Sequence, residues 1–206
     1  MAVKREGPTH RQRQALATKE QIARAARDLF ATQGYVATTI TAIAEAADIP
    51  APTIYSAMGS KAAILLAIGT SIAGKLDPFG RHAEALAQAD PAEGLRIVAR
   101  LQRDQFEAMY DVIAVYQEAA RTDPEIAQAI RTILGNRERA FRRHVEHIAD
   151  HLVPGVSADD AVSMYAAFVL PEIYRTFVVE RGWSNDKYEA WLAENLIRQL
   201  LSHPGR

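Results

Sequence analysis

Cysteine is absent from all 206 residues of the chain. Its absence excludes disulfides, thiolate nucleophiles and the cysteine-rich types of zinc site. Long apolar runs are missing too, and none approaches the roughly 20 residues that a membrane-spanning helix needs. The first residues, MAVKREGPTHRQRQ, contain no apolar segment of the kind found in secretory signals. We therefore expect a cytoplasmic protein without a membrane partner.

An excess of charge of either sign is also missing, since 24 Lys and Arg residues stand against 25 Asp and Glu residues. A content of 49% hydrophobic and 24% charged residues is typical of a globular chain. The charge is unevenly spread, because residues 1–61 hold eight basic and five acidic side chains, a net charge of +3, and the remainder has a net charge of −4. We therefore expect two domains, a modestly basic one at 1–61 and an acidic one at 62–206.

No run of alternating β-branched residues is long enough for a sheet, whereas apolar residues recur at spacings of three and four almost throughout. This pattern predicts an all-α fold. In the segment TKEQ, Thr18 and Gln21 match a capping box and Gly34 is a stop signal, so the first helix should span about 19–33. The remaining helices are expected at about 39–48, 52–57, 61–73, 91–109, 111–121, 124–151, 158–180 and 186–201.

The short segment DIPAP, residues 48–52, interrupts the helical pattern between two short helices. Asp48 stands where the turn needs a left-handed backbone, which aspartate tolerates because its short side chain bonds locally. Proline lacks an N–H group, which is harmless in a first helical turn, so Ala51 is the expected N-cap and Pro52 the first helical residue. The small Ala44 lets the two helices cross closely. The segment therefore predicts a helix-turn-helix.

A short helix presented by its N-terminus suits the major groove of DNA. The side chains expected to face the bases are Ala51, Pro52, Thr53 and Ser56. None of them is an Arg, Asn or Gln able to read a base with two hydrogen bonds, so specificity should depend partly on DNA shape and bound water. The expected phosphate contacts are Thr38, Thr39, Thr41, Tyr55 and Lys61, together with Lys4, Arg5, Arg11 and Arg13 from an N-terminal arm. An ordinary helical corner with a solvated basic tail is the alternative.

Residues 23–65, ARAARDLFATQGYVATTITAIAEAADIPAPTIYSAMGSKAAIL, resemble the DNA-binding domain of TetR-type (tetracycline repressor-like) transcriptional regulators. The order and spacing of LF…GY..TT, IA..A, TIY and SK carry the resemblance. It implies a three-helix helix-turn-helix domain, followed by a larger helical domain that binds a small-molecule effector and dimerises through its last two long helices. The implied partners are a double-stranded DNA operator, the effector and a second copy of the chain. The chain departs from the usual family residues at Asp48, Pro50, Pro52, Ala57, Met58 and Gly59.

Two C-terminal segments, DDAVSMYAAFVLPEIYRTFVVERGWS and YEAWLAENLIRQLL, carry wide apolar stripes. The side chains expected in an intersubunit four-helix bundle are Val162, Ala166, Val169, Ile173, Trp191, Leu192, Leu196 and Leu200. In such a two-fold dimer the two recognition helices would lie about 34 to 36 Å apart, one turn of DNA. Without the resemblance, packing of both helices inside a monomer fits the stripes equally well.

A mostly apolar effector pocket with a few polar groups is expected in the acidic domain. Its candidate residues are Gln105, Phe106, Met109, Tyr110, Tyr116, Glu118, Met164, Tyr165 and Phe168, although their helical spacing also fits a plain core. We interpret His144, His147 and His151 as a solvated polar face and not a metal site. The first and last of them lie roughly 10 Å apart along a helix, and no cysteine accompanies them.

The leading hypothesis is a homodimeric repressor that a small organic effector releases from a palindromic operator. The effector would favour a conformation in which the fourth helix pivots and the two reading heads no longer match adjacent grooves. No nucleophilic triad, phosphate-binding loop or metal triad is visible, so we expect neither an enzyme nor a cofactor. The alternatives are a helical enzyme or small-molecule carrier with a structural corner, and a protein-interaction module around Tyr55 whose binding needs neither Lys61 nor Arg11 and depends little on salt.

Overall fold

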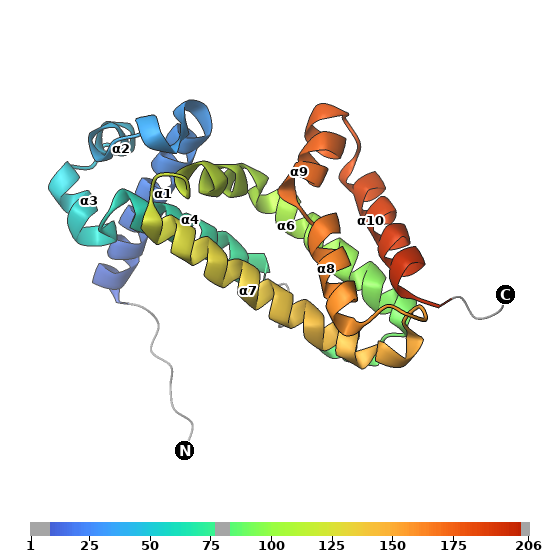
Figure 1. Cartoon of the computed structure of the whole chain (residues 1–206). Coiled ribbons are helices and arrows are strands. Elements are labelled where there is room, and N and C mark those ends of the chain that lie inside the picture. Colours follow the sequence, from blue (N-terminus) through green and yellow to red (C-terminus); the bar gives the residue numbers. More distant parts are fainter. Residues whose placement is uncertain (1–8, 77–82, 203–206) are drawn as a thin grey trace, which may run out of the picture. The chain divides into compact units, whose positions relative to one another are not determined.

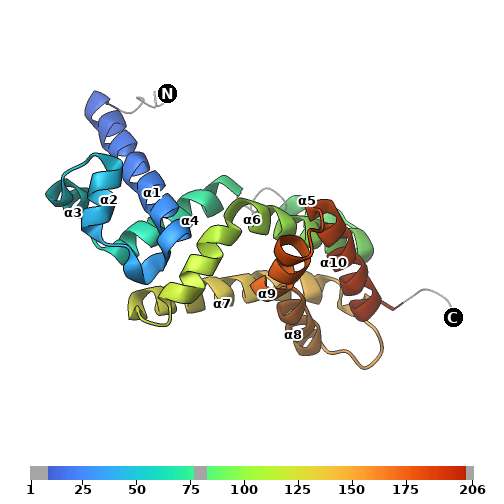
Figure 2. The same cartoon turned by 90° about the horizontal axis from the view of Figure 1, so that it is seen from above.

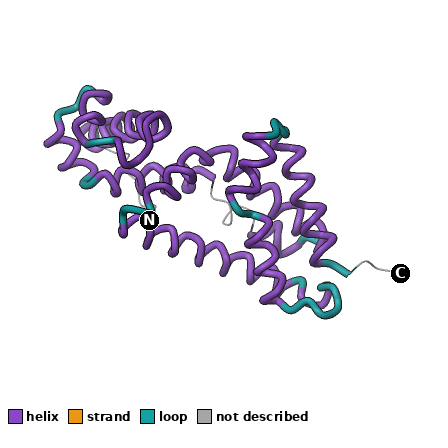
Figure 3. The backbone as a smooth tube through the Cα atoms, turned by 45° about the horizontal axis from the view of Figure 1, so that its top comes forward, coloured by secondary structure: helices purple, strands orange, loops and turns teal. Residues whose placement is uncertain are grey.

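The computed structural model describes residues 9–76 and 83–202, and every regular element in these ranges is a helix (Figure 3). The helices, labelled in Figure 1, are α1 (His10–Ala37), α2 (Ile40–Ala47), α3 (Ala51–Met58), α4 (Lys61–Leu76), α5 (Ala83–Gln88), α6 (Pro91–Ala119), α7 (Pro124–His147), η1 (Ala149–His151), α8 (Ala158–Phe168), α9 (Pro171–Tyr174), η2 (Arg175–Glu180) and α10 (Asn185–Leu200). The prediction of an all-α fold is confirmed.

The described residues divide into two compact units that do not follow the chain in order. Unit 1 combines residues up to 71 with residues 114–128, which form the end of α6 and the start of α7. Unit 2 combines residues 72–113 with residues from 129 onward. The expected boundary after residue 61 follows charge and motif, whereas the compact units also follow the packing of α4 and the α6–α7 corner.

Unit 1 is built around α1, against which both α2 and α3 pack (Figure 2). Its core side chains come from all four N-terminal helices and are buried by 96% or more: Ile22, Ala26, Phe30, Ile43, Ile54, Ile64, Leu65 and Ile68. In unit 2 the first half of α6, α7, α8 and α10 enclose a second core. Its largest fully buried side chains are Leu95, Phe106, Phe141, Ile148, Tyr188 and Leu192.

The first helix begins nine residues earlier than the sequence indicated. Thr9, not Thr18, forms the capping box: its hydroxyl accepts from the Gln12 amide at 3.3 Å, and the Gln12 side chain accepts from the Thr9 amide at 2.8 Å. Thr18 instead donates to the carbonyl of Gln14 within the helix. The stop signal at Gly34 was correct, because its φ of 81° breaks the helical geometry.

Two later helices also differ from expectation. The single helix expected at 158–180 is broken, because Pro171 has no N–H group and starts a new helix after the extended Leu170. The two helices expected on either side of residue 110 are one element, α6, with a kink at Met109 (φ −144°, ψ 20°). Helix α5 was not predicted, and α7 ends at His147 and not at residue 151.

Within the described ranges, no single helix is long and apolar enough to cross a membrane. Two bent pairs reach the length and composition together: α3 with α4, at 56°, and α8 with the segment Pro171–Glu180, at 43°.

Candidate functional site

The corner between α2 and α3 has the backbone that its sequence predicts. Asp48 adopts the left-handed conformation (φ 51°, ψ 46°), and its N–H bonds the carbonyls of Ala44 and Glu45. The amide of Ile49 also donates to the Ala44 carbonyl at 3.0 Å, which closes the end of α2. Gln21 on α1 donates to the carbonyl of Ala47 at 2.6 Å. The corner is therefore held both by its own backbone and by the helix beneath it.

Helix α3 starts one residue earlier than expected, at Ala51, and the extended Pro50 is its N-cap. The Pro50 carbonyl accepts from the amides of Thr53 and Ile54. Ile54 is the buried anchor of the helix at 0% exposure. The opposite face is open to solvent and presents the exposed side chains Pro52, Thr53, Tyr55 and Ser56, with Ala51 partly buried. A short helix with small exposed side chains and one exposed tyrosine is thus available for contact.

The three threonines expected at phosphates have different environments. Thr39 is exposed and caps α2, since its hydroxyl accepts from the Ala42 amide at 3.1 Å. Thr41 is exposed on the first turn of α2. Thr38 is only 1% exposed and donates to the Gly34 carbonyl at 2.7 Å. The structure therefore leaves Thr39 and Thr41 accessible and uses Thr38 to fasten the end of α1.

Lys61 is a structural clamp in unit 1. Its ammonium donates to the carbonyls of Tyr35, at 2.7 Å, and Thr38, at 2.8 Å. The same group lies 4.2 Å from the centroid of the Tyr35 ring. Burial lowers the pKa of Lys61, and the carboxylates of Asp123 and Glu118 oppose this. The expected phosphate contact from Lys61 is replaced here by a bond network that holds the approach to α2.

Two of the four basic residues expected on an N-terminal arm, Arg11 and Arg13, lie on a helix instead. Arg11 and Arg13 are exposed on the first turns of α1. Lys4 and Arg5 lie outside the described residues. Two basic side chains are therefore presented by a rigid element of unit 1.

The α6–α7 corner, which is part of unit 1, is hydrogen-bonded to the end of α1 and to α4. The Tyr35 hydroxyl donates to the carboxylate of Asp123 at 2.7 Å, and the Val36 amide donates to that of Glu118 at 3.2 Å. The hydrogen bond from Tyr35 is the main cause that lowers the pKa of Asp123, and burial is the main cause that raises that of Tyr35. Tyr116 donates to the carbonyl of Leu65 on α4 at 3.2 Å. Tyr116 and Glu118, which were expected in the effector pocket, thus belong to unit 1.

The other expected pocket residues lie in unit 2, where aromatic rings gather. Phe106 on α6 lies 4.8 Å from Tyr174 and 6.2 Å from Tyr188, between ring centroids. Tyr110 lies 5.2 Å from Tyr174, and Tyr165 stacks on Phe141 at 3.7 Å. Met109 is buried at the kink of α6, and Met164 and Phe168 are partly buried against the same core. The sequence reasoning missed Tyr174, Phe141 and Tyr188.

The buried glutamine of α6 is Gln102 and not the expected Gln105. Gln102 is 3% exposed, and its oxygen accepts from a guanidinium nitrogen of Arg137 on α7. Gln105 is partly exposed. Arg137 also donates to the hydroxyl of Tyr165 at 3.4 Å, and its guanidinium carbon lies 5.6 Å from that ring's centroid. This role of Arg137 could not be predicted from the sequence, since an arginine on a polar helix is usually solvated.

Most residues expected at the dimer interface are inside the chain's own core. Buried there are Val162, Val169, Leu192, Leu196 and Leu200, each at most 4% exposed. Ala166 is exposed, and Ile173 and Trp191 are partly exposed. The stripes were read correctly as apolar, but their centres pack against α6 and α7 because each stripe is wide enough to face inward. Exposed neighbours such as Ala167 and Leu170 remain on the outside.

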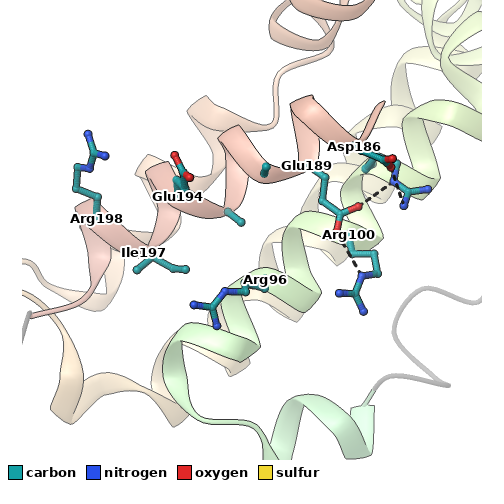
Figure 4. A pocket seen from close by; sticks show the side chains of 10 residues that line it. Arg96, Arg100, Asp186, Glu189, Glu194, Ile197 and Arg198 are labelled. Carbon is teal, nitrogen blue, oxygen red and sulfur yellow. Dashed lines mark hydrogen bonds and ion pairs between the residues drawn. The ribbon is translucent and has the colours of Figure 1, made fainter. Parts of the chain in front are cut away.

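An open groove of about 680 Å³ lies between α6 and α10 (Figure 4). Glu189 crosses it, accepting from Nε of Arg100 at 3.3 Å and from Nε of Arg103 at 3.0 Å. Its lining contains none of the residues expected in the effector pocket: Arg96, Arg100, Arg103, Asp186, Glu189, Ala190, Ala193, Glu194, Ile197 and Arg198. These ion pairs tie the two helices, and being near the surface each contributes little.

His144 contradicts the interpretation of the three histidines as a solvated face. It is 8% exposed and lies so close to Gly94 that a Cβ there would be 2.5 Å from its Cε1. Burial, with His147 as a smaller cause, lowers its pKa to about 4. His147 and His151 are exposed. Among the described residues, no three His, Cys, Asp or Glu side chains form a group that could hold a metal ion.

Comparison with known proteins agrees with the corner and with the helical fold. Residues 22–68 match the model of a family described as bacterial regulatory proteins, tetR family. A comparison with curated proteins found no match.

Solved structures that resemble the chain over most of its length include three regulators. The fatty acid degradation regulator FadR from Bacillus halodurans has a TM-score of 0.72 at 19% identity, covering 94% of this chain and 97% of that one. FadR from Bacillus subtilis, in complex with stearoyl-CoA, has 0.68 at 21%, covering 86% and 97%. NalD, the secondary repressor of an efflux pump in Pseudomonas aeruginosa, has 0.71 at 17%, covering 90% and 98%. At these identities the likeness establishes the fold.

Proposed function

We propose that this chain is a homodimeric, ligand-responsive transcriptional repressor, because residues 22–68 match the model of the tetR family of bacterial regulatory proteins. It binds a palindromic operator in the cytoplasm, and a small organic effector releases it. The observation that carries the proposal is the corner at Asp48, whose left-handed backbone presents the exposed face of α3. The larger helical unit, with its buried aromatic and polar side chains, supports a role in holding the effector.

The exposed face of α3 suits the major groove by size. Pro52 and the Thr53 methyl group can contact thymine methyls, and the hydroxyls of Thr53 and Ser56 can make single hydrogen bonds. Ser56 already donates to the Thr53 carbonyl at 3.0 Å, which leaves its lone pairs as acceptors. None of the side chains on this face is an Arg, Asn or Gln that could form two hydrogen bonds with one guanine or adenine. Specificity then depends strongly on DNA shape and ordered water.

The phosphate contacts fall to the accessible groups around α3. Thr39 and Thr41 lie at the start of α2, where a helix N-terminus favours anions. Tyr55 is 58% exposed on α3, and Arg11 and Arg13 are exposed on α1. Lys61 positions this surface through the backbone carbonyls that it binds.

The first test is selection of bound sequences from a random pool of duplex DNA at near-physiological salt. Enrichment of an inverted repeat is the expected result, and Tyr55→Phe should then weaken binding about three- to tenfold on every selected sequence, because one phosphate hydrogen bond is lost. Absence of enrichment at all salt concentrations would reject a sequence-specific DNA reader. If Tyr55→Phe bound the selected DNA as tightly as the wild type, only the assignment of Tyr55 as a phosphate contact would be wrong.

The dimer surface is proposed on the outer side of the C-terminal helices. Of the residues first expected there, Ala166 is exposed and Trp191 partly exposed, and Ala167 and Leu170 continue this surface. Ala166→Arg should convert the dimer to a monomer in analytical ultracentrifugation, because a long charged side chain would replace a methyl group at a close helix contact. Glu194→Arg, exposed on α10, keeps both the dimer and the fold if the interface lies where we propose.

A further inference from the structure

Polar side chains from four helices converge in the interior of unit 2. Gln102 comes from α6, Arg137 from α7, Tyr165 from α8 and Tyr188 from α10. Arg137 joins two of them, donating to the Gln102 oxygen through Nη2 and to the Tyr165 hydroxyl through Nε. Convergence of a few polar groups among aromatic side chains is the usual form of a small-molecule site.

Two of these groups have buried polar atoms without a hydrogen-bond partner among the described residues. They are Nε2 of Gln102, on a residue 3% exposed, and the hydroxyl of Tyr188, which is 0% exposed. The arginine fixes the amide orientation, because it needs the glutamine oxygen as acceptor, so Nε2 is left as a donor. Burial raises the pKa of Tyr188, with the charge of Arg137 opposing the rise, so this hydroxyl also keeps its proton. Each of these donors costs free energy as long as no acceptor binds it.

Arg137 brings a positive charge to this cluster. The described partners of Arg137 are an amide oxygen, a hydroxyl and an aromatic ring, all neutral. By contrast, Arg103 and Arg142 of the same unit each bind carboxylates. An arginine presents its donors in a fork that matches a carboxylate, and a partly buried guanidinium gains most from an anion. All three available groups are therefore suited to one acceptor, and a cationic ligand would meet a like charge.

The surroundings of the cluster are apolar, and the face of α7 that carries Phe141 continues to an exposed leucine. Phe106 lies against Tyr188, and Phe141 stacks on Tyr165. Leu134 lies seven residues before Phe141 and therefore on the same face of α7. Phe141 is 2% exposed, whereas Leu134 is 53% exposed. This face of α7 therefore carries an exposed apolar side chain one helical turn before Arg137.

We infer that unit 2 binds an organic carboxylate with a hydrophobic body, its acid group held by Arg137, Gln102 Nε2 and the Tyr188 hydroxyl. The hydrophobic body lies among the aromatic rings, on the side of the cluster toward Leu134. Calling this ligand the effector rests on the proposed function, whereas its binding to the protein does not.

The test uses the full chain without DNA and measures binding by isothermal titration calorimetry. The probes are benzoate, phenylacetate, indoleacetate, octanoate and dodecanoate, each compared with its own primary amide, and choline as a cation. At least one acid should bind about tenfold or more tighter than its amide, because hydrogen bonds to a charged group are the stronger ones. Choline should not bind. Equal affinity of acids and amides, or no binding of any acid, would overturn the proposal without any variant.

Variants then locate the acid group. Arg137→Met should lose at least about tenfold in affinity for the acid and little for the amide, Arg137→Lys should fall between, and Tyr188→Phe should lose about three- to tenfold. Arg139→Met, on the exposed face of α7, is the matched control and should bind as the wild type does. Undiminished acid binding by Arg137→Met would overturn the assignment.

The same probes separate this inference from the proposed function. If an acid binds with this variant pattern but no DNA sequence is selected, the carboxylate site is supported and the proposed function as a DNA-binding regulator is wrong. If an operator is selected and no acid binds, the carboxylate site is wrong and the proposed function is retained.

Discussion

Lys61 shows how much the packing of unit 1 depends on one side chain. Its ammonium donates to the carbonyls of Tyr35 and Thr38 at the end of α1. Tyr35 precedes Lys61 by 26 residues in the sequence. We expect Lys61→Met to lower the free energy of unfolding by about 1–3 kcal/mol, because two buried carbonyls lose a charged donor. Urea unfolding measures this.

Lys19→Met is the control for Lys61→Met, since Lys19 is exposed on α1. It should change stability by less than about 0.5 kcal/mol. A similarly small effect of Lys61→Met would mean that its two bonds contribute nothing net.

His144 should make the stability of the chain depend on pH. Its folded pKa of about 4 lies below the ordinary 6.5, chiefly because it is buried. The unfolded chain therefore takes up a proton in this window while the folded chain does not, so stability falls as pH drops from about 6.5 to about 4, by up to about 3 kcal/mol. His144→Leu should remove this part of the pH dependence in urea unfolding at a series of pH values.

His151→Leu should retain the wild-type pH profile, because His151 is exposed. An unchanged profile in His144→Leu would mean that His144 is protonated in the folded state or reaches solvent by a local movement.

At the scale of elements, α4 approaches α6 closely enough that a glycine is required. A Cβ on Gly69 would collide with the hydroxyl of Tyr116, which donates to the Leu65 carbonyl. Gly69→Ala should therefore destabilise the chain by about 1–3 kcal/mol despite the better helix propensity of alanine. Tyr116→Phe removes the colliding oxygen, so the double variant should be more stable than the two single effects predict.

A double-mutant cycle measures this coupling, and a coupling energy near zero would show that α4 shifts away freely. Gly74→Ala on the same helix is the matched control, since nothing lies within 4 Å of the added atom. It should be neutral or slightly stabilising.

The elements that could be predicted from the sequence are those fixed by neighbouring residues. The corner at Asp48 was predictable because a left-handed turn needs one tolerant residue and two short helices on either side. The clamp at Lys61 was not, because its partners are backbone carbonyls of a distant helix. A lysine after a helix-turn-helix has the same local pattern whether it faces phosphate or a carbonyl.

For the candidate ligand site, the sequence predicted the aromatic character of the residues but not the full set of side chains that the fold brings together. Phe106, Tyr110 and Tyr165 are in the aromatic core, as their spacing allowed. Tyr116 was misplaced, because α6 is one continuous helix whose end belongs to the other unit. Arg137 was missed, because an arginine turned inward is recognised only when its neighbours from three other helices are known.

For the whole molecule, the described chain passes between unit 1 and unit 2 within α4, at residues 71–72, and on both sides of the α6–α7 corner, at residues 113–114 and 128–129. The α6–α7 corner is the connection whose carboxylates accept hydrogen bonds from the end of α1. It binds α1 through the Tyr35–Asp123 and Val36–Glu118 hydrogen bonds. In the proposed mechanism, an effector that favours one arrangement of α6 would shift unit 1 by no more than its difference in affinity for the two arrangements. We expect Tyr35→Phe to reduce the loss of DNA affinity that a saturating effector causes, with effector binding to the DNA-free protein unchanged. Fluorescence anisotropy of labelled operator measures both.

The proposed dimer makes a geometric prediction about its operator. Two reading heads held by one two-fold axis should engage half-sites about 34 to 36 Å apart, on one face of the duplex. Inserting about 5 base pairs between the half-sites turns one of them to the opposite face of the duplex, and this should reduce the affinity to that of a single half-site. Inserting about 10 base pairs returns the half-site to the same face but leaves it too far from its partner. If affinity did not change with the first insertion, each head would be binding alone, and the dimer would have no part in reading DNA. Because α3 is short and carries no bidentate side chain, we expect a single half-site to bind too weakly for regulation, which makes this spacing the main source of operator selectivity.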